Sequence, residues 1–304
     1  MSSYQVVIIG GGPAGLTAGI YTSRAGLKSL LLEKGVFGGQ IVDAPRVENY
    51  PGFPEGISGY DLSLLIYQQA TRFGLETQTV EVTGITPGKS LVVATPAGNL
   101  EAQAVIIAAG AERSRLNVPG ESHFLGKGVG YCTTCDGFLF RDKEVAVVGG
   151  GDTAITDALE LAQHATRVYL IHRRSSLRAS EVLQHRVFAQ PKVQLVWDTV
   201  IDEIKGDEQV RELKLRHAQT GKTSRLTVDG VFVAVGIKPN TKPFAGVVEL
   251  DPTGSVVVNE SLATSAPGIF AAGDIRKDSP RQVASAVGDG VMAATSVFKY
   301  LQEG

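Results

Sequence analysis

The amino-acid sequence predicts an α/β protein made of two three-layer units, with the second unit inserted into the first. Three observations support this fold class. An apolar run leads into a glycine-rich turn at two places, each turn is followed by a helix pattern and another strand, and each unit closes on an apolar strand that ends at glycine. The 304 residues are also sufficient for two domains of about 100–200 residues each.

The first unit begins with the apolar run VVII at residues 6–9, an unbroken hydrophobic stretch typical of a buried parallel strand. The turn GGGPAG at residues 10–15 follows. Pro13 suits the first turn of a helix, because an N–H group would have no partner there. The next apolar strand ends at Glu33, and AVIIAAG at residues 104–110 is the expected returning strand.

The second unit repeats this order. The run VAVV at residues 145–148 leads into GGGDTA at residues 149–154, where Asp152 places a negative side chain at the positive end of a helix. The next strand ends at His172, and the end of this strand lies 18 positions beyond the turn in both units. GVFVAVG at residues 230–236 closes the second unit in the same way as the first.

Two segments rich in Pro, Gly and Asn, at residues 111–121 and 236–244, are candidate linkers. They place the second unit inside the first. We therefore expect two Rossmann-like nucleotide-binding domains: a discontinuous outer domain of residues 1–118 and 243–304, and an inserted domain of residues 119–242.

A further apolar strand, GIFAAG at residues 268–273, leads to Asp274. The carboxyl ends of parallel strands are where open α/β sheets bind ligands, so Gly273 and Asp274 are candidate binding residues, although Gly-Asp is also a common turn. Residues 282–301 predict a long C-terminal helix.

The composition excludes several classes of partner. With 29 basic and 31 acidic residues, the formal net charge of -2 gives no electrostatic reason to expect nucleic acid or an anionic membrane as a partner. No apolar run reaches the roughly 20 residues that a spanning helix needs, and the N-terminus lacks a signal-peptide pattern. We expect a cytoplasmic location. Two cysteines are too few for a disulfide scaffold.

The first glycine turn matches a dinucleotide site. In such a turn the first glycine allows the tight bend, the second lets a pyrophosphate approach the backbone, and the third lets helix and strand pack closely. These positions are Gly10, Gly12 and Gly15, and Glu33 is placed to accept hydrogen bonds from a ribose hydroxyl. A solvated carboxylate at a strand end is the simpler alternative for Glu33, but its offset from the turn favours the ribose role.

The second glycine turn differs at the ribose position, where four basic residues replace the carboxylate. Guanidinium groups bind phosphate oxygens bidentately, whereas a carboxylate would repel them, so the sequence favours NADP over NAD. A solvated basic loop is the alternative interpretation. The candidate residues for the nicotinamide dinucleotide are Gly149, Gly151, Asp152, Thr153, Ala154, His172, Arg173, Arg174 and Arg178.

The two cysteines form a CxxC pair, Cys132 and Cys135, within YCTTCDG. A zinc site would need further ligands, and the five histidines form no such pattern, so we expect no metal. Two buried structural cysteines are another alternative. The spacing favours a reversible disulfide, and Asp136 directly after the pair could move protons. Two dinucleotide sites in one chain, one with an acidic residue and one with arginines at the ribose position, suggest one bound flavin dinucleotide and one exchanging nicotinamide. Together with the cysteine pair they would form an electron relay.

The motifs GGGPAG, VENYPGFP, CTTCDG, GGGDTA, HRRSSLR and GD followed by RQVASAVGDG resemble, in order and spacing, the low-molecular-weight thioredoxin reductases over nearly the whole chain. This resemblance implies a homodimeric FAD enzyme in which NADPH reduces FAD, FAD reduces the Cys132–Cys135 disulfide, and the dithiol reduces thioredoxin. It also implies that Cys135 lies nearest the flavin, that Cys132 attacks the partner and that Asp136 is the acid–base group.

The resemblance further implies which residues contact FAD. They are Gly10, Gly12, Pro13, Ala14, Gly15, Glu33, Lys34, Gly39, Gln40, Asn49, Val82, Gly110, Gly273, Asp274, Arg281, Gln282 and Val283. In that family the inserted domain rotates against the flavin domain, and the two candidate linkers are where such a rotation would occur.

One residue departs from the family pattern. Alanine usually follows the first cysteine, whereas this chain has Thr133, whose hydroxyl could alter the disulfide potential or the fit of the partner. Three alternatives stay open: another disulfide protein as partner, another donor such as ferredoxin, and a redox sensor with little turnover. The arginine cluster favours NADPH as the donor, and a ferredoxin–NADP reductase would have no use for the cysteine pair.

Overall fold

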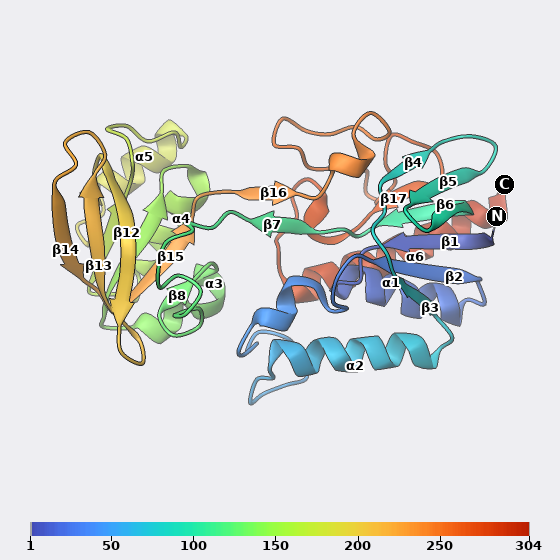
Figure 1. The fold of residues 1–304 in the computed structure, drawn as a ribbon, viewed down its shortest axis with the longest axis horizontal. Coiled ribbons are helices and arrows are strands. Elements are labelled where there is room, and N and C mark those ends of the chain that lie inside the picture. Colours follow the sequence, from blue (N-terminus) through green and yellow to red (C-terminus); the bar gives the residue numbers. More distant parts are fainter. Residues whose placement is uncertain (1, 304) are drawn as a thin grey trace. The chain divides into compact units, whose positions relative to one another are not determined.

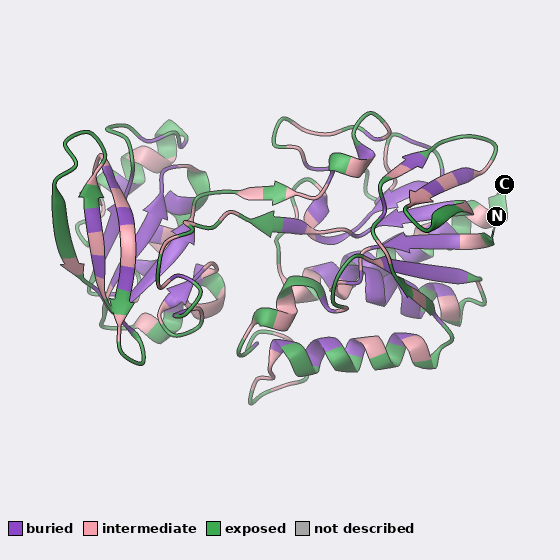
Figure 2. Cartoon of the chain, in the orientation of Figure 1, coloured by how far each residue is buried: buried purple, intermediate pink, exposed green. Residues whose placement is uncertain are grey.

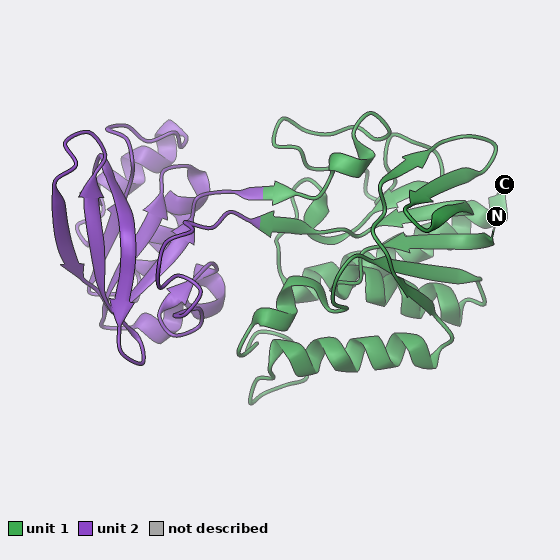
Figure 3. Ribbon diagram, in the orientation of Figure 1, with its two compact units in different colours: residues 1–112, 238–304 green, residues 113–237 purple. Residues whose placement is uncertain are grey.

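The computed structural model describes residues 2–303, which form two compact units (Figure 3). Unit 1 comprises Met1–Glu112 and Lys238–Gly304, and unit 2 comprises Arg113–Ile237. The chain therefore leaves and re-enters unit 1 once, as an insertion requires. The α/β fold class expected from the repeated strand–turn–helix pattern is confirmed.

The division between the units lies six residues before the expected boundary at 118/119 and five before that at 242/243. The first difference arises because the backbone N–H groups of Leu116 and Asn117 donate to the buried Glu121 carboxylate of unit 2. The second arises because Asn240 bonds through its backbone N–H to the Gly110 carbonyl in unit 1. The crossings are β7 (Ala111–Arg113) and β16 (Ile237–Pro239), which pair in a two-stranded sheet.

Unit 1 is built on a seven-stranded sheet with the order β3-β2-β1-β6-β5-β4, and β17 pairs with β6 (Figure 1). The pairs among β3, β2, β1, β6 and β17 are parallel, and β4 and β5 are antiparallel additions. The strands are β1 (Ser3–Ile9), β2 (Ser29–Glu33), β3 (Glu76–Thr79), β4 (Gly84–Thr86), β5 (Leu91–Thr95), β6 (Gly98–Ile107) and β17 (Ile269–Ala271).

Both faces of this sheet are buried at its centre, which explains the continuous apolar runs at residues 6–9, 30–32 and 104–107 of β1, β2 and β6, whereas the edge strand β3 is polar and mostly exposed (Figure 2). Alternate residues of β1 enter opposite cores: Val6 and Ile8 pack with helices α1, α2 and α6, whereas Val7 and Ile9 pack with β2, β5 and the segment after residue 244. The helices are α1 (Pro13–Arg24), α2 (Gly59–Arg72), α6 (Val283–Glu303) and the 3-10 turns η1 (Gly39–Asp43), η3 (Lys242–Phe244) and η4 (Gly273–Ile275).

Unit 2 is also a three-layer unit. Its central parallel sheet has the order β11-β10-β9-β15-β8, with helices against one face and the antiparallel sheet β12-β13-β14 against the other. The elements are β8 (Val129–Gly130), α3 (Thr133–Asp136), η2 (Gly137–Phe140), β9 (Glu144–Gly149), α4 (Asp152–Leu161), β10 (Arg167–Ile171), α5 (Glu181–Phe188), β11 (Val193–Val196), β12 (Thr199–Gly206), β13 (Val210–His217), β14 (Thr223–Thr227) and β15 (Gly230–Ala234).

The expected closing strands are shorter at their ends than the sequence suggests. β6 ends at Ile107 rather than at Gly110, and β15 ends at Ala234 rather than at Gly236, because both glycines adopt a positive φ, of 63° and 130°, that a strand does not accommodate. The antiparallel sheet β12-β13-β14 is not part of the sequence prediction. It supplies Ile201, which packs beneath the parallel sheet of unit 2.

Candidate functional site

The two cysteines form a disulfide at the start of α3, with their Cα atoms 5.3 Å apart. Cys132 caps the short helix, and its Sγ accepts a hydrogen bond of 3.2 Å from the backbone N–H of Cys135. Both residues and the adjacent Asp136 are partly exposed. The CxxC pair therefore forms an intramolecular disulfide between two partly exposed residues.

The residue before the disulfide is held by a buried carboxylate. Glu121 is 2% exposed and accepts three hydrogen bonds, from the backbone N–H groups of Leu116 and Asn117 at 2.9 and 2.7 Å and from the Tyr131 hydroxyl at 2.7 Å. Burial and then the Glu121 carboxylate raise the pKa of Tyr131. Glu121 thus joins the segment at the unit boundary to the residue next to Cys132, a role that the sequence analysis did not identify.

The residues after Cys132 contact two carboxylates of α4. Thr133 Oγ1 lies 2.6 Å from Asp157 Oδ1 and 3.1 Å from Glu160 Oε2. Burial raises the pKa of Asp157 to about 6, against the opposing effect of the Thr133 hydrogen bond. Sequence reasoning noted Thr133 but missed both carboxylates, although their spacing of three residues places them on one face of a helix.

The glycine turn of unit 2 packs closely on its own surroundings. A Cβ atom at Gly149 would meet the carbonyl oxygen of Ala234, and one at Gly150 would meet the ring of His172. At Gly151, in contrast, a Cβ atom would meet nothing within 4 Å. Its glycine is therefore not required by packing within the chain, and it leaves the N-terminus of α4 open to a ligand.

The basic loop that follows β10 is tied to this turn by backbone hydrogen bonds. Arg178 N donates to the Gly150 carbonyl at 2.7 Å, and Ser180 N donates to Asp152 Oδ1 at 2.7 Å. The side chains of Arg173 and Arg174, like that of Arg178, are exposed, and none of the three forms an ion pair with another described residue. Three guanidinium groups thus lie on a loop anchored to the turn.

His172 is placed differently from these arginines. It is 5% exposed, and its ring packs under Gly150 and edge-on to Trp197 with the ring centroids 6.4 Å apart. Burial lowers the pKa of His172, so the imidazole is neutral at pH 7. The structure therefore separates His172, which supports the turn from below, from the exposed arginines of the same motif.

The glycine turn of unit 1 has the same construction. A Cβ atom at Gly10 would meet the carbonyl oxygen of Ala108, whereas one at Gly12 would meet only Gly39 Cα, at 4.0 Å. The Glu33 carboxylate lies at this turn and accepts from the backbone N–H of Gly11 at 2.6 Å. The backbone N–H of Gly38 donates to the Gly11 carbonyl at 2.7 Å, which brings η1 against the turn.

The remaining candidates of unit 1 differ in what they offer to a ligand. Gln40 Nε2 donates to the Ala111 carbonyl, and Asn49 Nδ2 donates to Gln282 Oε1 at 3.1 Å. Lys34 forms an exposed ion pair of 3.3 Å with Glu112, which contributes little to stability.

The other candidates of unit 1 are placed by their burial or backbone conformation. Val82 is buried in the core, so only its backbone is available to a ligand. Gly110, Arg281 and Val283 lie in the segments that the prediction named, Arg281 with a φ of 57° and Val283 at the start of α6.

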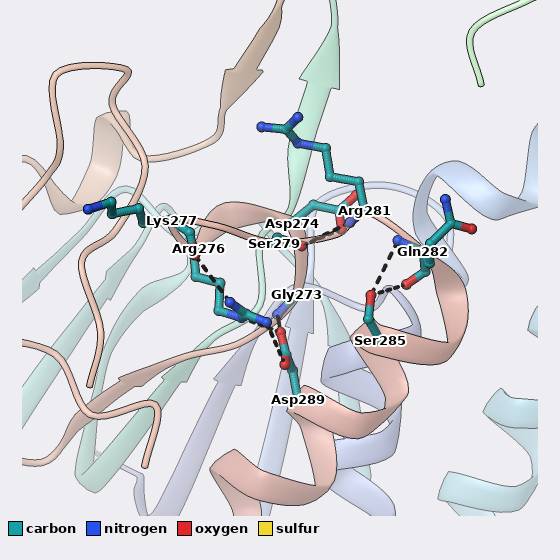
Figure 4. Close-up of polar contacts among 9 residues, drawn as sticks. All are labelled: Gly273, Asp274, Arg276, Lys277, Ser279, Arg281, Gln282, Ser285 and Asp289. Atoms are coloured by element: carbon teal, nitrogen blue, oxygen red, sulfur yellow. Dashed lines mark hydrogen bonds and ion pairs between the residues drawn. The ribbon is translucent and has the colours of Figure 1, made fainter. Parts of the chain in front are cut away.

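Gly273 and Asp274 lie at the carboxyl end of β17, and a Cβ atom at Gly273 would be 3.0 Å from Ala14 of the first turn. Figure 4 shows their surroundings. Asp289 Oδ2 accepts from the backbone N–H of Gly273 at 2.9 Å and from Arg276 Nε at 2.6 Å. This largely buried ion pair, absent from the sequence prediction, fixes the loop that carries Asp274.

The described residues contain no group of three or more His, Cys, Asp or Glu side chains arranged to hold a metal ion. Among the same residues, no helix is long and apolar enough to span a membrane.

The model of the pyridine nucleotide-disulphide oxidoreductase family matches residues 4–290. The chain belongs to this family. The thioredoxin reductases of Listeria innocua and Bacillus subtilis are each 44% identical to it over 302 residues, covering 99% of this chain and 94% and 95% of theirs. The solved thioredoxin reductase of Streptococcus pyogenes is 40% identical with a TM-score of 0.95, and covers 100% of this chain and 99% of its own.

Pyridine nucleotide-disulphide oxidoreductases of the thioredoxin reductase type use FAD and NADPH, and both glycine turns fit such ligands. Gly12 and Gly151 each leave space that a side chain would fill, at the N-terminus of a helix of ten residues or more. Helix N-termini attract the negative charge of a pyrophosphate. The turn beside Glu33 suits the ribose of FAD, and the turn beside three arginines suits the 2′-phosphate of NADPH.

Proposed function

We propose that this chain is an NADPH-dependent thioredoxin-disulfide reductase that acts through Cys132 and Cys135. The observation that carries this proposal is the partly exposed disulfide at the start of α3, in the same unit as the turn suited to NADPH. Relatives that bear the name thioredoxin reductase, aligned over almost the whole of this chain, support the choice of partner.

The residues proposed to hold the cofactors follow from the two turns. FAD would contact Gly10 to Gly15, Glu33 and the segments around Gly39, Asn49, Asp274 and Gln282. When bound, FAD supplies two-electron chemistry between a nicotinamide and a disulfide. NADPH would contact the turn at Gly149 to Ala154, with Arg173, Arg174 and Arg178 on its 2′-phosphate. The buried His172 would act by supporting Gly150 rather than by binding phosphate.

The two cysteines carry out the exchange. Two electrons and two protons break the Cys132–Cys135 bond and leave two thiols. The Cys132 thiolate then attacks the disulfide of thioredoxin, which forms a mixed disulfide and releases one thiolate of the partner. Cys135 attacks Cys132 Sγ, which restores the internal disulfide and releases thioredoxin as a dithiol. Asp136, directly after Cys135, would hold the proton that these steps move.

Exposed apolar side chains next to the disulfide support docking of a protein partner. Phe138 and Leu139 on η2 are 48% and 53% exposed, three and four residues after Cys135. Isolated apolar side chains at a surface are common, but two adjacent ones beside a reactive disulfide fit the apolar centre of a transient interface.

We also propose a homodimer and a cytoplasmic location. The resemblance to thioredoxin reductases implies the dimer, and α2 offers an apolar surface in Tyr60 and Leu64, one helical turn apart and 59% and 40% exposed. Sedimentation of Leu64→Glu beside the control Val182→Glu tests the dimer: only the first change is expected to produce monomers.

The cytoplasmic location is proposed because a disulfide that cycles during catalysis suits a reducing compartment, where stable disulfides are rare.

The first experiment is an anaerobic titration of the purified holoprotein with NADPH and, separately, with NADH, followed by visible flavin absorption. Bleaching by NADPH at far lower concentration than by NADH is expected. The protein reduced in this way should then reduce thioredoxin, and the amount of thioredoxin reduced should be proportional to the thiols of the reduced protein. Flavin that neither nucleotide bleaches would overturn the donor assignment and make ferredoxin the donor to test, whereas bleaching without thioredoxin reduction would indicate another disulfide protein as partner.

A further inference from the structure

A group of two threonines and two carboxylates holds the helix that carries the disulfide. Thr133 Oγ1 donates to Asp157 Oδ1 at 2.6 Å and lies 3.1 Å from Glu160 Oε2, and Thr134 Oγ1 donates to the same Glu160 oxygen at 3.3 Å. Thr133 is only 3% exposed, so its hydroxyl is shielded from water. Since α3 has four residues, these bonds hold half of them.

The two carboxylates lie on α4, the helix that also follows the glycine turn of unit 2. α4 begins at Asp152, directly after Gly151 of the turn suited to NADPH, and Asp157 and Glu160 lie on its second and third turns. A hydroxyl that donates to a carboxylate forms a charge-assisted bond, which is stronger than a bond between neutral groups. The alanine usual at the Thr133 position in the family that this chain resembles could not form this bond.

We propose that Asp157 and Glu160 are positioning residues of the redox disulfide, which hold α3 through Thr133 and Thr134 and thereby set how readily the Cys132–Cys135 bond is reduced. The proposal deepens the function proposed above and rests on it for the role of the cysteines. The physical reason is that a disulfide closes most easily when both sulfur atoms are held near each other, so a loosened α3 favours the open dithiol.

The charge of Asp157 adds a second effect. The charged groups that act on it are Glu160 on its own helix and Arg113 on β7, while Asp136 lies on the packed helix α3. Burial raises the pKa of Asp157 to about 6, so the group is mostly ionised at pH 7 and neutral at pH 5. Asp157 bonds to Thr133, the residue directly after Cys132. Because a carboxylate near a thiol disfavours the thiolate, neutralising Asp157 should make the reduced cysteines more reactive.

The decisive variant is Thr133→Val, which keeps the shape of the side chain and removes only the hydroxyl. Thr133→Ser keeps the hydroxyl, and Thr156→Val is a matched change at an exposed threonine of α4. Each FAD holoprotein is equilibrated anaerobically with dithiothreitol buffers at pH 7, and the cysteines are counted by alkylation and mass spectrometry. Flavin absorption reports whether each variant is folded and loaded.

We expect Thr133→Val to be reduced more readily than the wild type, by severalfold to about tenfold in the equilibrium constant, and the two other variants to match the wild type. A wild-type equilibrium constant in flavin-loaded Thr133→Val would overturn the proposal. The titration uses neither NADPH nor thioredoxin, so its outcome is separate from that of the proposed function.

A second variant covers the case in which Thr133→Val does not load with flavin. Asp157→Asn keeps an acceptor for Thr133 and removes the charge. Iodoacetamide should alkylate its reduced cysteines about threefold faster or more at pH 7, and the difference from the wild type should shrink toward pH 5, where Asp157 is neutral. Identical rates across this pH range would refute the influence of Asp157 on the dithiol.

Discussion

Replacing the buried carboxylate of Glu121 by an amide should destabilise unit 2 strongly. In the native protein Oε1 accepts from Leu116 N and the Tyr131 hydroxyl, and Oε2 accepts from Asn117 N. In Glu121→Gln the amide nitrogen necessarily faces at least one of these donors. That donor is left unpaired in a site 2% exposed, and the loss of one charge-assisted bond with an unpaired buried group costs about 2–4 kcal/mol.

For a unit of this size a change of 1 kcal/mol corresponds to about 4 °C in the unfolding temperature. Glu121→Gln should therefore unfold about 8–15 °C below the wild type, and Tyr131→Phe, which leaves both backbone bonds in place, should lose less than half as much. Thermal unfolding followed by far-UV circular dichroism is the assay, with the exposed Glu208→Gln as a matched control in the same unit. If Glu121→Gln and Glu208→Gln unfold at the same temperature, the three hydrogen bonds do not stabilise the unit.

Three further predictions concern the site. Cys135→Ser should retain its flavin and lose thioredoxin reduction, and continued turnover in a coupled assay with thioredoxin would contradict the proposed relay. Arg173→Ala combined with Arg174→Ala should raise the KM for NADPH about tenfold or more and leave that for NADH nearly unchanged; equal effects on both nucleotides in steady-state assays would refute the 2′-phosphate role. The raised pKa of Asp157, about 6, means that the folded protein holds this proton more tightly than the unfolded chain, so this group's contribution to stability falls as pH rises from about 4 to 6. The free energy of unfolding of Asp157→Asn, measured relative to that of the wild type, should therefore be more favourable to the variant at pH 7 than at pH 4. If the difference between the two proteins is the same at both pH values, the pKa of Asp157 is not shifted in this way.

Features carried by short stretches of sequence were predictable. An apolar run before a glycine turn defines a buried strand and a helix start within about ten residues, and both turns form as expected. The disulfide could likewise be expected because its two cysteines are three positions apart. In each case the contacting atoms are close in the chain, so little depends on the rest of the fold.

Features that depend on packing between distant segments were not predictable. Thr133 meets Asp157 across 24 residues, and this contact depends on how α3 lies against α4. His172 follows β10 at the expected offset, yet its ring turns inward under Gly150 while Arg173 turns outward. Sequence spacing gives the position of a residue along a loop, but the side of the chain on which its side chain lies is set by neighbouring elements.

The domain boundaries show the same limit. Pro, Gly and Asn predicted two linker segments, but the residues at which the chain passes from one compact unit to the other depend on single long-range hydrogen bonds. Glu121 draws Leu116 and Asn117 into unit 2, and the Gly110 carbonyl draws Asn240 into unit 1. Composition cannot distinguish such residues from solvated neighbours in the same linker.

The pairing of the two crossing strands makes unit 2 an exchangeable cassette. Its 113–237 segment is continuous, and near its two ends the backbone N–H of Ser114 donates to the Gly236 carbonyl at 2.9 Å. The two ends of the 113–237 segment are therefore adjacent, so a single recombination at each crossing could replace the entire segment. A short turn from Glu112 to Lys238 could join the two pieces of unit 1 in its absence. A change of electron donor or of protein partner could then evolve by substitution of one gene fragment, without disturbing the register of any strand in the seven-stranded sheet.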